Sequence, residues 1–162
     1  MEELLEKAKN NYFNEINSKE TFDIFNNIVN ETGNNEAKFY IAEMYYFGIG
    51  TEQNLEKTFQ YMRELAIEDY EDAYFWVGNM CFQGEGTEIN DKEAVKYLLK
   101  AVNVENVNTE KAEYILGMIY LQGKENGIDV EENKEYGLEL IKRSAQKGYE
   151  DAINKLKELN IK

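Results

Sequence analysis

The sequence predicts an all-α protein, an α-solenoid in which antiparallel helix pairs stack in a right-handed superhelix. The first observation behind this prediction is a repeat, because four alanines follow one another at spacings of 36, 39 and 40 residues: Ala37, Ala73, Ala112 and Ala152. The second is that each full repeat contains two amphipathic stretches of helical period. The third is a glycine pair between those stretches, in "YYFGIGTEQN" at 45–54 and "MCFQGEGTEIN" at 80–90.

The first 36 residues are expected to form a degenerate helix pair. Residues 1–15 would supply its first helix and "SKETFDIFNNIVNETG" its second, with Ser18 as the N-cap and Gly33 at the junction with the next repeat. Phe22 and Phe25 then lie on the face of the second helix that points to the core. A terminal repeat is often atypical because it closes the core against water.

The first helix of each full repeat, the A helix, begins near the recurrent alanine. Offsets of 0, 4, 5 and 8 from that alanine mark one face of a helix with 3.6 residues per turn, which we call the core stripe. At offsets 4, 5 and 8 the three repeats carry Ile41, Ala42 and Tyr45; Val77, Gly78 and Cys81; Leu116, Gly117 and Tyr120. Gly48, Gly84 and Gly123 at offset 11 predict a C-cap of positive φ, which glycine adopts without strain.

The second helix of each repeat, the B helix, is expected to begin after an asparagine N-cap. The stretches are "NLEKTFQYMRELA", "NDKEAVKYLLKAV" and "NKEYGLELIKRSA", with the caps Asn54, Asn90 and Asn133. Extra residues of the third repeat fall in its A-to-B loop around "KENGID". The predicted organisation is one domain over 1–162, with a degenerate repeat at 1–36, repeats at 37–72, 73–111 and 112–151, and a closing helix at 152–162.

The pattern A-x3-[ILV]-[AG]-x2-Y-x2-G-x-G, followed by a capped helix, resembles the Sel-one-like repeat family, slightly longer relatives of the tetratricopeptide repeat. The resemblance covers residues 37 to 152, and "AYFWVGNMCFQGEGTEINDKEAVKYLLKAV" carries it most fully. It implies an α-solenoid that binds other proteins and has no chemistry of its own. Gly137 departs from the family pattern, because it replaces the B-helix alanine kept as Ala94, and we expect it to loosen the third helix pair.

Composition and charge exclude several classes of function. Eighteen basic and thirty-two acidic residues give a net charge of −14, which disfavours nucleic acid and anionic membranes and favours a basic partner. The chain has no histidine, so the commonest general base and zinc ligand are missing. Cys81 is the only cysteine, which fits a cytoplasmic protein, and we expect a buried thiol. We therefore expect no enzyme, no catalytic residue, no cofactor and no metal.

The glycine pairs could also begin a phosphate-binding loop. Such a loop requires a preceding strand, and a P-loop also requires G-K-[ST]. Gly48, Gly50, Gly84 and Gly86 instead recur after a predicted helix. We interpret them as turns of the repeat.

Each A helix carries a second stripe at offsets 2, 6 and 9 from the recurrent alanine, and these positions also share one helix face. Seven of the nine residues are apolar or aromatic: Phe39, Glu43, Tyr46, Phe75, Asn79, Phe82, Tyr114, Met118 and Leu121. Together with the neighbouring Phe47 they are the predicted lining of a concave groove that binds a protein or peptide. The alternative is that the second stripe is buried between neighbouring helices, and the sequence leaves both open.

Three hypotheses about function follow. The first is a non-enzymatic adaptor or regulator that holds a basic or apolar segment of a partner in the groove. The second is an immunity or inhibitor protein whose acidic surface neutralises a basic toxin or effector domain, which the net charge of −14 motivates. The third, a hydrolase, has no clustered nucleophile or histidine to support it. The sequence does not decide the oligomeric state.

Overall fold

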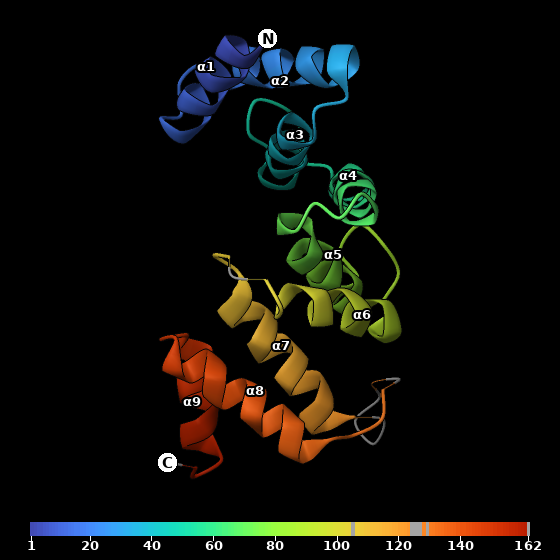
Figure 1. Cartoon of the computed structure of the whole chain (residues 1–162), viewed down its shortest axis with the longest axis vertical. Coiled ribbons are helices and arrows are strands. Elements are labelled where there is room, and N and C mark those ends of the chain that lie inside the picture. The colour runs from blue at the N-terminus through green and yellow to red at the C-terminus, as the bar shows by residue number, and fades with distance from the viewer. Residues whose placement is uncertain (105, 124–127, 129, 162) are drawn as a thin grey trace. The chain divides into compact units, whose positions relative to one another are not determined.

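The structure, a computed structural model, describes residues 1–104, 106–123, 128 and 130–161. Within these ranges it contains nine helices and no strand (Figure 1). The helices are α1 (Glu2–Phe13), α2 (Ser18–Thr32), α3 (Asn35–Phe47), α4 (Leu55–Ile67), α5 (Asp72–Gln83), α6 (Asp91–Ala101), α7 (Thr109–Gln122), α8 (Lys134–Gln146) and α9 (Glu150–Glu158). The predicted all-α helical repeat is confirmed. The insertion predicted around "KENGID" lies largely outside the described residues.

The chain divides into two compact units. The first comprises Met1–Ala73 with Glu85–Thr87, and the second comprises Tyr74–Gly84 with Glu88–Lys162. In the first unit, α1 packs on α2, α2 on α3 and α3 on α4. In the second, α6 packs on α7, α7 on α8 and α8 on α9. No helix in the described part of the chain is long and apolar enough to cross a membrane.

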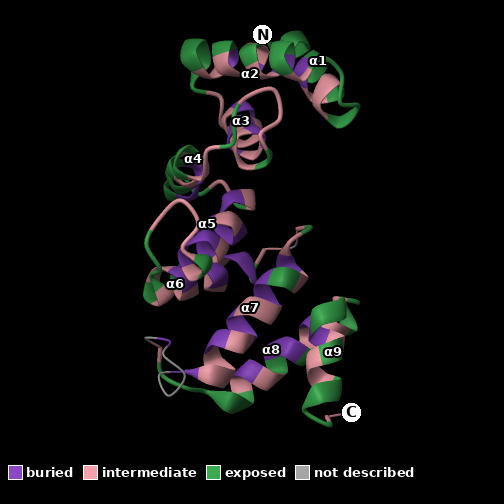
Figure 2. Ribbon diagram, turned by 180° about the vertical axis from the view of Figure 1, so that it is seen from behind, coloured by how far each residue is buried: buried purple, intermediate pink, exposed green. Residues whose placement is uncertain are grey.

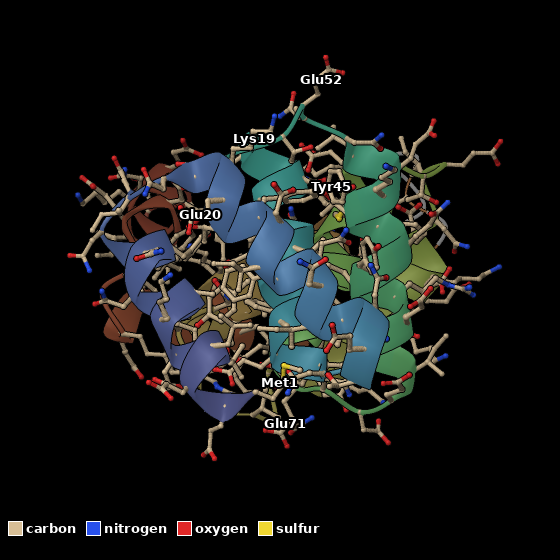
Figure 3. The ribbon with its side chains drawn as sticks, turned by 90° about the horizontal axis from the view of Figure 1, so that it is seen from above. Met1, Lys19, Glu20, Tyr45, Glu52 and Glu71 are labelled. Carbon is tan, nitrogen blue, oxygen red and sulfur yellow. The ribbon has the colours of Figure 1, made fainter. Side chains whose placement is uncertain are left out.

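Most of the core stripe lies in the interior of the two units, as predicted, although Tyr45 and Tyr120 at offset 8 are only half-buried. The four recurrent alanines are fully buried, and so are the residues four positions later in the three repeats, Ile41, Val77 and Leu116. Buried residues are found on helices of both units (Figure 2). Tyr45 lies between the rings of Phe22 and Tyr61, whereas Glu52 points away from the helices (Figure 3). Cys81 is buried and forms no disulfide, as expected.

Asparagine caps begin the B helices, as predicted. The side chain of Asn54 accepts a hydrogen bond from the backbone N–H of Lys57 at 2.9 Å, and Asn90 and Asn133 make the equivalent bonds. The predicted Ser18 cap is wrong, because α2 already begins at Ser18 and Asn17 precedes it. Asn17 has a φ of +47° and makes no capping bond. Its side-chain amide donates instead to the carboxylate of Glu20 at 3.3 Å.

The glycine pairs are turns of the repeat. Gly48, Gly84 and Gly123 follow the A helices with φ of +69°, +74° and +55°, which confirms the predicted C-caps. The second glycine of each pair lies against the start of the preceding B helix. A Cβ on Gly86 would collide with the carbonyl oxygen of Leu55, and one on Gly50 would collide with that of Ser18. These glycines therefore have a structural role that no phosphate ligand is needed to explain.

The third helix pair packs through two facing glycines. A Cβ on Gly117 would lie 2.8 Å from the carbonyl oxygen of Gly137, and a Cβ on Gly137 would lie 2.8 Å from that of Gly117. The expectation that Gly137 loosens this pair is therefore wrong. Without side chains at these positions, the backbones of α7 and α8 approach more closely than an alanine would allow.

Gly33 and Gly86 have the same φ of +67°, but only Gly86 has a neighbour where a Cβ would lie, the carbonyl group of Leu55. Substituting each by alanine therefore distinguishes the cost of backbone strain from the cost of a steric clash. We expect Gly33→Ala to cost about 1 kcal/mol for the left-handed conformation alone. Gly86→Ala should cost about 1–3 kcal/mol more, as overpacked sites do. Urea unfolding of both variants measures the difference. Equal losses would contradict the contact with the B helix.

Candidate protein-binding surface

The second stripe of α3 is partly exposed in the first unit. Phe39, Glu43 and Tyr46 are each intermediate between buried and exposed, and the neighbouring Phe47 is 57% exposed. The Phe39 ring lies 5.6 Å from that of Tyr70, between centroids, which orients it beside the loop after α4. These side chains are thus fixed on one side by the fold while they keep accessible surface on the other.

Two tyrosine hydroxyls hold carboxylates at this stripe. The hydroxyl of Tyr12, on α1, donates to Oε2 of Glu43 at 3.2 Å. The hydroxyl of Tyr46 donates to Oε2 of Glu85, also at 3.2 Å. Glu85 is the residue between the two glycines of the second repeat, and it belongs to the first unit.

Glu43 has the most perturbed carboxyl group at this surface. The pKa of Glu43 is raised from 4.5 to about 7 in total, because burial raises it most, the hydrogen bond from Tyr12 lowers it and the charge of the nearby Asp72 raises it. Burial and the charge of Glu43 in turn raise the pKa of the Tyr12 phenol. Glu43 therefore changes its charge near neutral pH, unlike a solvated carboxyl group.

The second stripe of the second unit lies on α5 and α7. Asn79, Phe82, Tyr114, Met118 and Leu121 are intermediate in exposure, and Tyr114 packs against Tyr149 with ring centroids 5.4 Å apart. Phe75 differs from the others, because only 9% of it is exposed. It belongs with the buried side chains, so it does not offer the accessible ring that a groove residue requires. The second stripe is thus mostly half-buried, between the two alternatives that the sequence left open.

Sequence reasoning missed the partners of these residues. Tyr12 lies in the degenerate first helix, where the repeat gives no alignment, and Glu85 lies at the variable position of a glycine turn. The glycine turn itself was the available signal for Glu85, because it predicts a loop next to the A helix. No local pattern indicates that Tyr12 reaches Glu43, 31 residues away.

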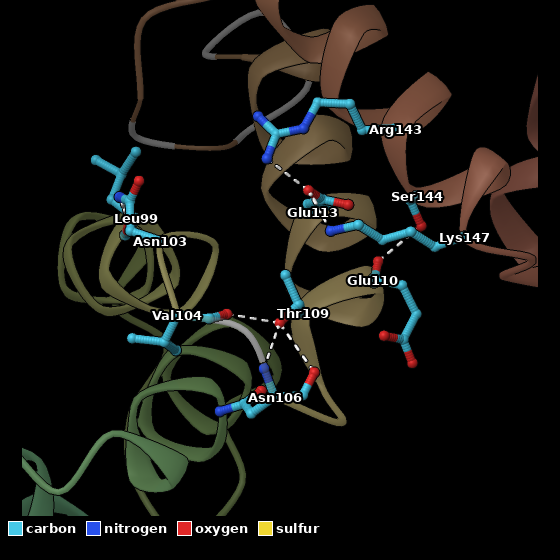
Figure 4. A network of polar contacts seen from close by, with 10 residues as sticks. All are labelled: Leu99, Asn103, Val104, Asn106, Thr109, Glu110, Glu113, Arg143, Ser144 and Lys147. Atoms are coloured by element: carbon cyan, nitrogen blue, oxygen red, sulfur yellow. Dashed lines mark hydrogen bonds and ion pairs between the residues drawn. The ribbon is translucent and has the colours of Figure 1, made fainter.

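The second unit also contains a buried carboxylate that no sequence pattern indicates. Glu113 on α7 is fully buried, and its Oε1 accepts from Arg143 at 2.7 Å and Lys147 at 2.9 Å (Figure 4). Its Oε2 has no hydrogen-bond partner among the described residues. Arg143 lies on α8 and Lys147 is its C-cap residue, so this network joins α7 to the end of α8 and has a structural role.

Comparisons with known proteins agree with this architecture. The family model of the Sel1 repeat matches residues 35–70, 71–103 and 110–149. A protective antigen of uropathogenic Escherichia coli with an SLR fold is 23% identical, with a TM-score of 0.71. A Sel1 repeat protein of Oxalobacter formigenes is 23% identical, with a TM-score of 0.69. A protein of Klebsiella pneumoniae described as a Sel1 repeat protein is 19% identical, with a TM-score of 0.55.

The three similar structures differ in how much of each protein the similarity covers. The first two similarities cover 84% of this chain but only 28% and 53% of those proteins, and the third covers 97% of this chain and 76% of that one. At this identity the similarity shows the fold alone. A comparison with curated proteins gives no match.

The raised pKa of Glu43 predicts how its removal affects stability. The folded state binds the proton more tightly than the unfolded state, so the Glu43 contribution is favourable at low pH and is lost as pH rises from about 4.5 through about 7. Glu43→Gln keeps an acceptor for Tyr12 without the charge. We expect it to raise the free energy of unfolding by about 1–3 kcal/mol at pH 8 and to change it little at pH 5.

Urea unfolding at the two pH values tests this prediction, with Glu31→Gln as the matched control. Glu31 is an exposed glutamate on α2 in the same unit, so its variant removes the same formal charge without a buried group. The prediction fails if Glu43→Gln changes stability equally at pH 5 and pH 8.

Proposed function

Since this chain belongs to the Sel1 repeat family, we propose that it is a non-enzymatic adaptor or regulator that holds a peptide or protein surface on the second stripe of its A helices. Sel1 repeat proteins are generally protein–protein interaction modules. Their repeats stack side by side and present the same helix positions repeatedly, which suits extended partners.

The observation that carries this proposal is the half-buried state of the second stripe. Phe75 of this stripe is covered by the fold. Phe39, Tyr46 and Phe82 instead keep part of their surface accessible. Rigid aromatic anchors of this kind supply much of the binding energy in protein interfaces, and apolar surface that solvent reaches is typical of interaction sites.

Charge determines which partners fit. With a net charge of −14, the protein attracts basic surfaces and accelerates their association at low salt. We therefore propose a partner segment with apolar anchors and basic flanking residues, and neither nucleic acid nor a membrane as the partner. We also propose a cytoplasmic location, where a lone buried thiol such as Cys81 stays reduced.

The same charge favours one alternative, an immunity or inhibitor protein that covers a basic toxin or effector domain. That role would use the acidic exterior of the protein more than the aromatic stripe. Charge reversals at exposed glutamates would then weaken binding more than Phe39→Ala does. An adaptor that uses the second stripe shows the opposite order.

The proposal predicts that Phe39→Ala weakens peptide binding. A 12-residue random peptide library is selected on the full chain, and a synthetic peptide from the selection is titrated by isothermal calorimetry. Losing an aromatic anchor should weaken binding about 30-fold, equivalent to about 2 kcal/mol. The thermal midpoint of each variant shows whether it remains folded.

Phe59→Ala provides the matched control, because Phe59 is a half-buried phenylalanine on α4, a B helix of the same unit. We expect Phe59→Ala to leave the affinity unchanged. Binding that is lost in Phe59→Ala and kept in Phe39→Ala would move the site to the B helices and refute the proposal.

A further inference from the structure

The carboxylates at the second stripe of α3 lack the cations that other carboxylates of the same unit have. Glu36 pairs with Lys9 at 2.7 Å, and Glu64 pairs with Lys38 at 3.4 Å. Glu43 and Glu85 instead accept hydrogen bonds from tyrosine hydroxyls, and neither has a lysine or arginine partner in the described part of the chain. A hydroxyl donor satisfies an oxygen atom but does not neutralise the charge.

The surroundings of Glu43 confirm that its charge is uncompensated. The titratable groups that act on it or feel its charge are Tyr12 on α1, Tyr40 on α3, Tyr70 after α4 and Asp72 at the start of α5. All four are neutral or negative at neutral pH. Lys9, which acts on Tyr40, is already held by Glu36 and Glu6, at 2.7 and 2.8 Å.

Aromatic residues surround the contacts of this carboxyl group, because Tyr12 donates a hydrogen bond to it and the charge of Glu43 acts on Tyr40 and Tyr70. The rings of Tyr12 and Tyr40 have centroids 5.1 Å apart, and those of Phe39 and Tyr70 have centroids 5.6 Å apart. Tyr12 also borders a hollow of about 600 Å³ that Phe13 and Ile49 help to line. The faces of such rings attract cations. A carboxylate next to aromatic residues therefore offers a cation both an ionic partner and π faces.

We propose that the second stripe of α3 binds a basic peptide segment whose lysine or arginine side chain pairs with Glu43 next to these aromatic residues. The inference rests on the proposed function, because it specifies the partner of the same surface. Two observations on charge support the inference. Glu43 has no cationic partner among the described residues, and the whole chain carries a net charge of −14. An apolar neighbour of the cationic residue would then contact Phe39 or Tyr46.

Such a pair couples binding to pH. Burial holds the pKa of Glu43 at about 7, so the empty site is only about one-tenth ionised at pH 6 and about nine-tenths ionised at pH 8. A cation binds the ionised form, and apparent affinity scales with the population of that form. The affinity should therefore rise about tenfold from pH 6 to pH 8, with release of a proton at lower pH.

Calorimetry with a capped 12-residue peptide, selected as above and free of His, Asp and Glu, tests this inference. We expect the wild-type protein to bind it about tenfold more tightly at pH 8 than at pH 6. Glu43→Gln should weaken binding at pH 8 at least tenfold and remove the pH dependence, whereas Glu31→Gln should bind like the wild type. Titrations in two buffers of different ionisation enthalpy should show proton release at pH 7 in the wild type and in Glu31→Gln, but not in Glu43→Gln.

A change in the peptide tests the same pair without altering the protein. Each lysine is replaced by norleucine and each arginine by citrulline, one at a time. One replacement should weaken binding to the wild type and have no further effect on Glu43→Gln, as expected for two groups that interact directly.

The outcomes distinguish this inference from the proposed function. If Phe39→Ala weakens binding but Glu43→Gln, the neutral peptides and pH have no effect, the cation pair is refuted and the binding stripe stands. If no selected peptide is weakened by Phe39→Ala, both are refuted.

Discussion

The close approach of each A helix to its B helix, at small residues, is the contact on which the rest of the structure depends. A Cβ on Gly78 would lie 2.7 Å from Cγ of Leu98, and Gly117 and Gly137 face each other equally closely. In the first full repeat, the Thr58 hydroxyl donates to the carbonyl of Ala42 at 3.2 Å. These contacts fix which face of the A helix is covered. Successive residues of an α-helix are rotated by about 100° around its axis. The second stripe therefore lies on a different face of the A helix from the recurrent alanine.

That geometry explains why one helix has two apolar faces. The core stripe is buried except at Tyr45 and Tyr120, whereas the second stripe is mostly only half-buried, which leaves rings such as Phe39 accessible. The glycine turns contribute to the same arrangement, because Gly86 brings the loop that carries Glu85 into contact with the preceding B helix. A structural turn thus also delivers a carboxylate to the candidate binding surface, where the Tyr46 hydroxyl holds it.

Glu113 and Glu43 are both poorly solvated, but their charges have different surroundings. Glu113 is fully buried and pairs with Arg143 of α8 and with Lys147, the C-cap residue of α8, so its charge is neutralised inside the fold. Glu43 is only partly buried and meets a neutral hydroxyl. A buried charge without a counterion destabilises the fold. A carboxyl group with a strongly shifted pKa at an accessible surface is typical of functional sites. The contrast separates a carboxylate that joins two helices from one available to a partner.

The sequence by itself determined the helical repeat, the asparagine caps, the glycine turns and the core stripe. These features depend on residues within one or two helical turns of each other, so a periodic pattern records them. Only the tertiary structure decided that Phe75 is buried, that Gly137 tightens a helix pair, and that Asn17 precedes α2 without capping it. It also decided the pairs at the candidate surface, where Tyr12 meets Glu43 across 31 residues and Tyr46 meets Glu85 across 39. Such contacts follow from the packing of separate helices, which no local pattern of residues records.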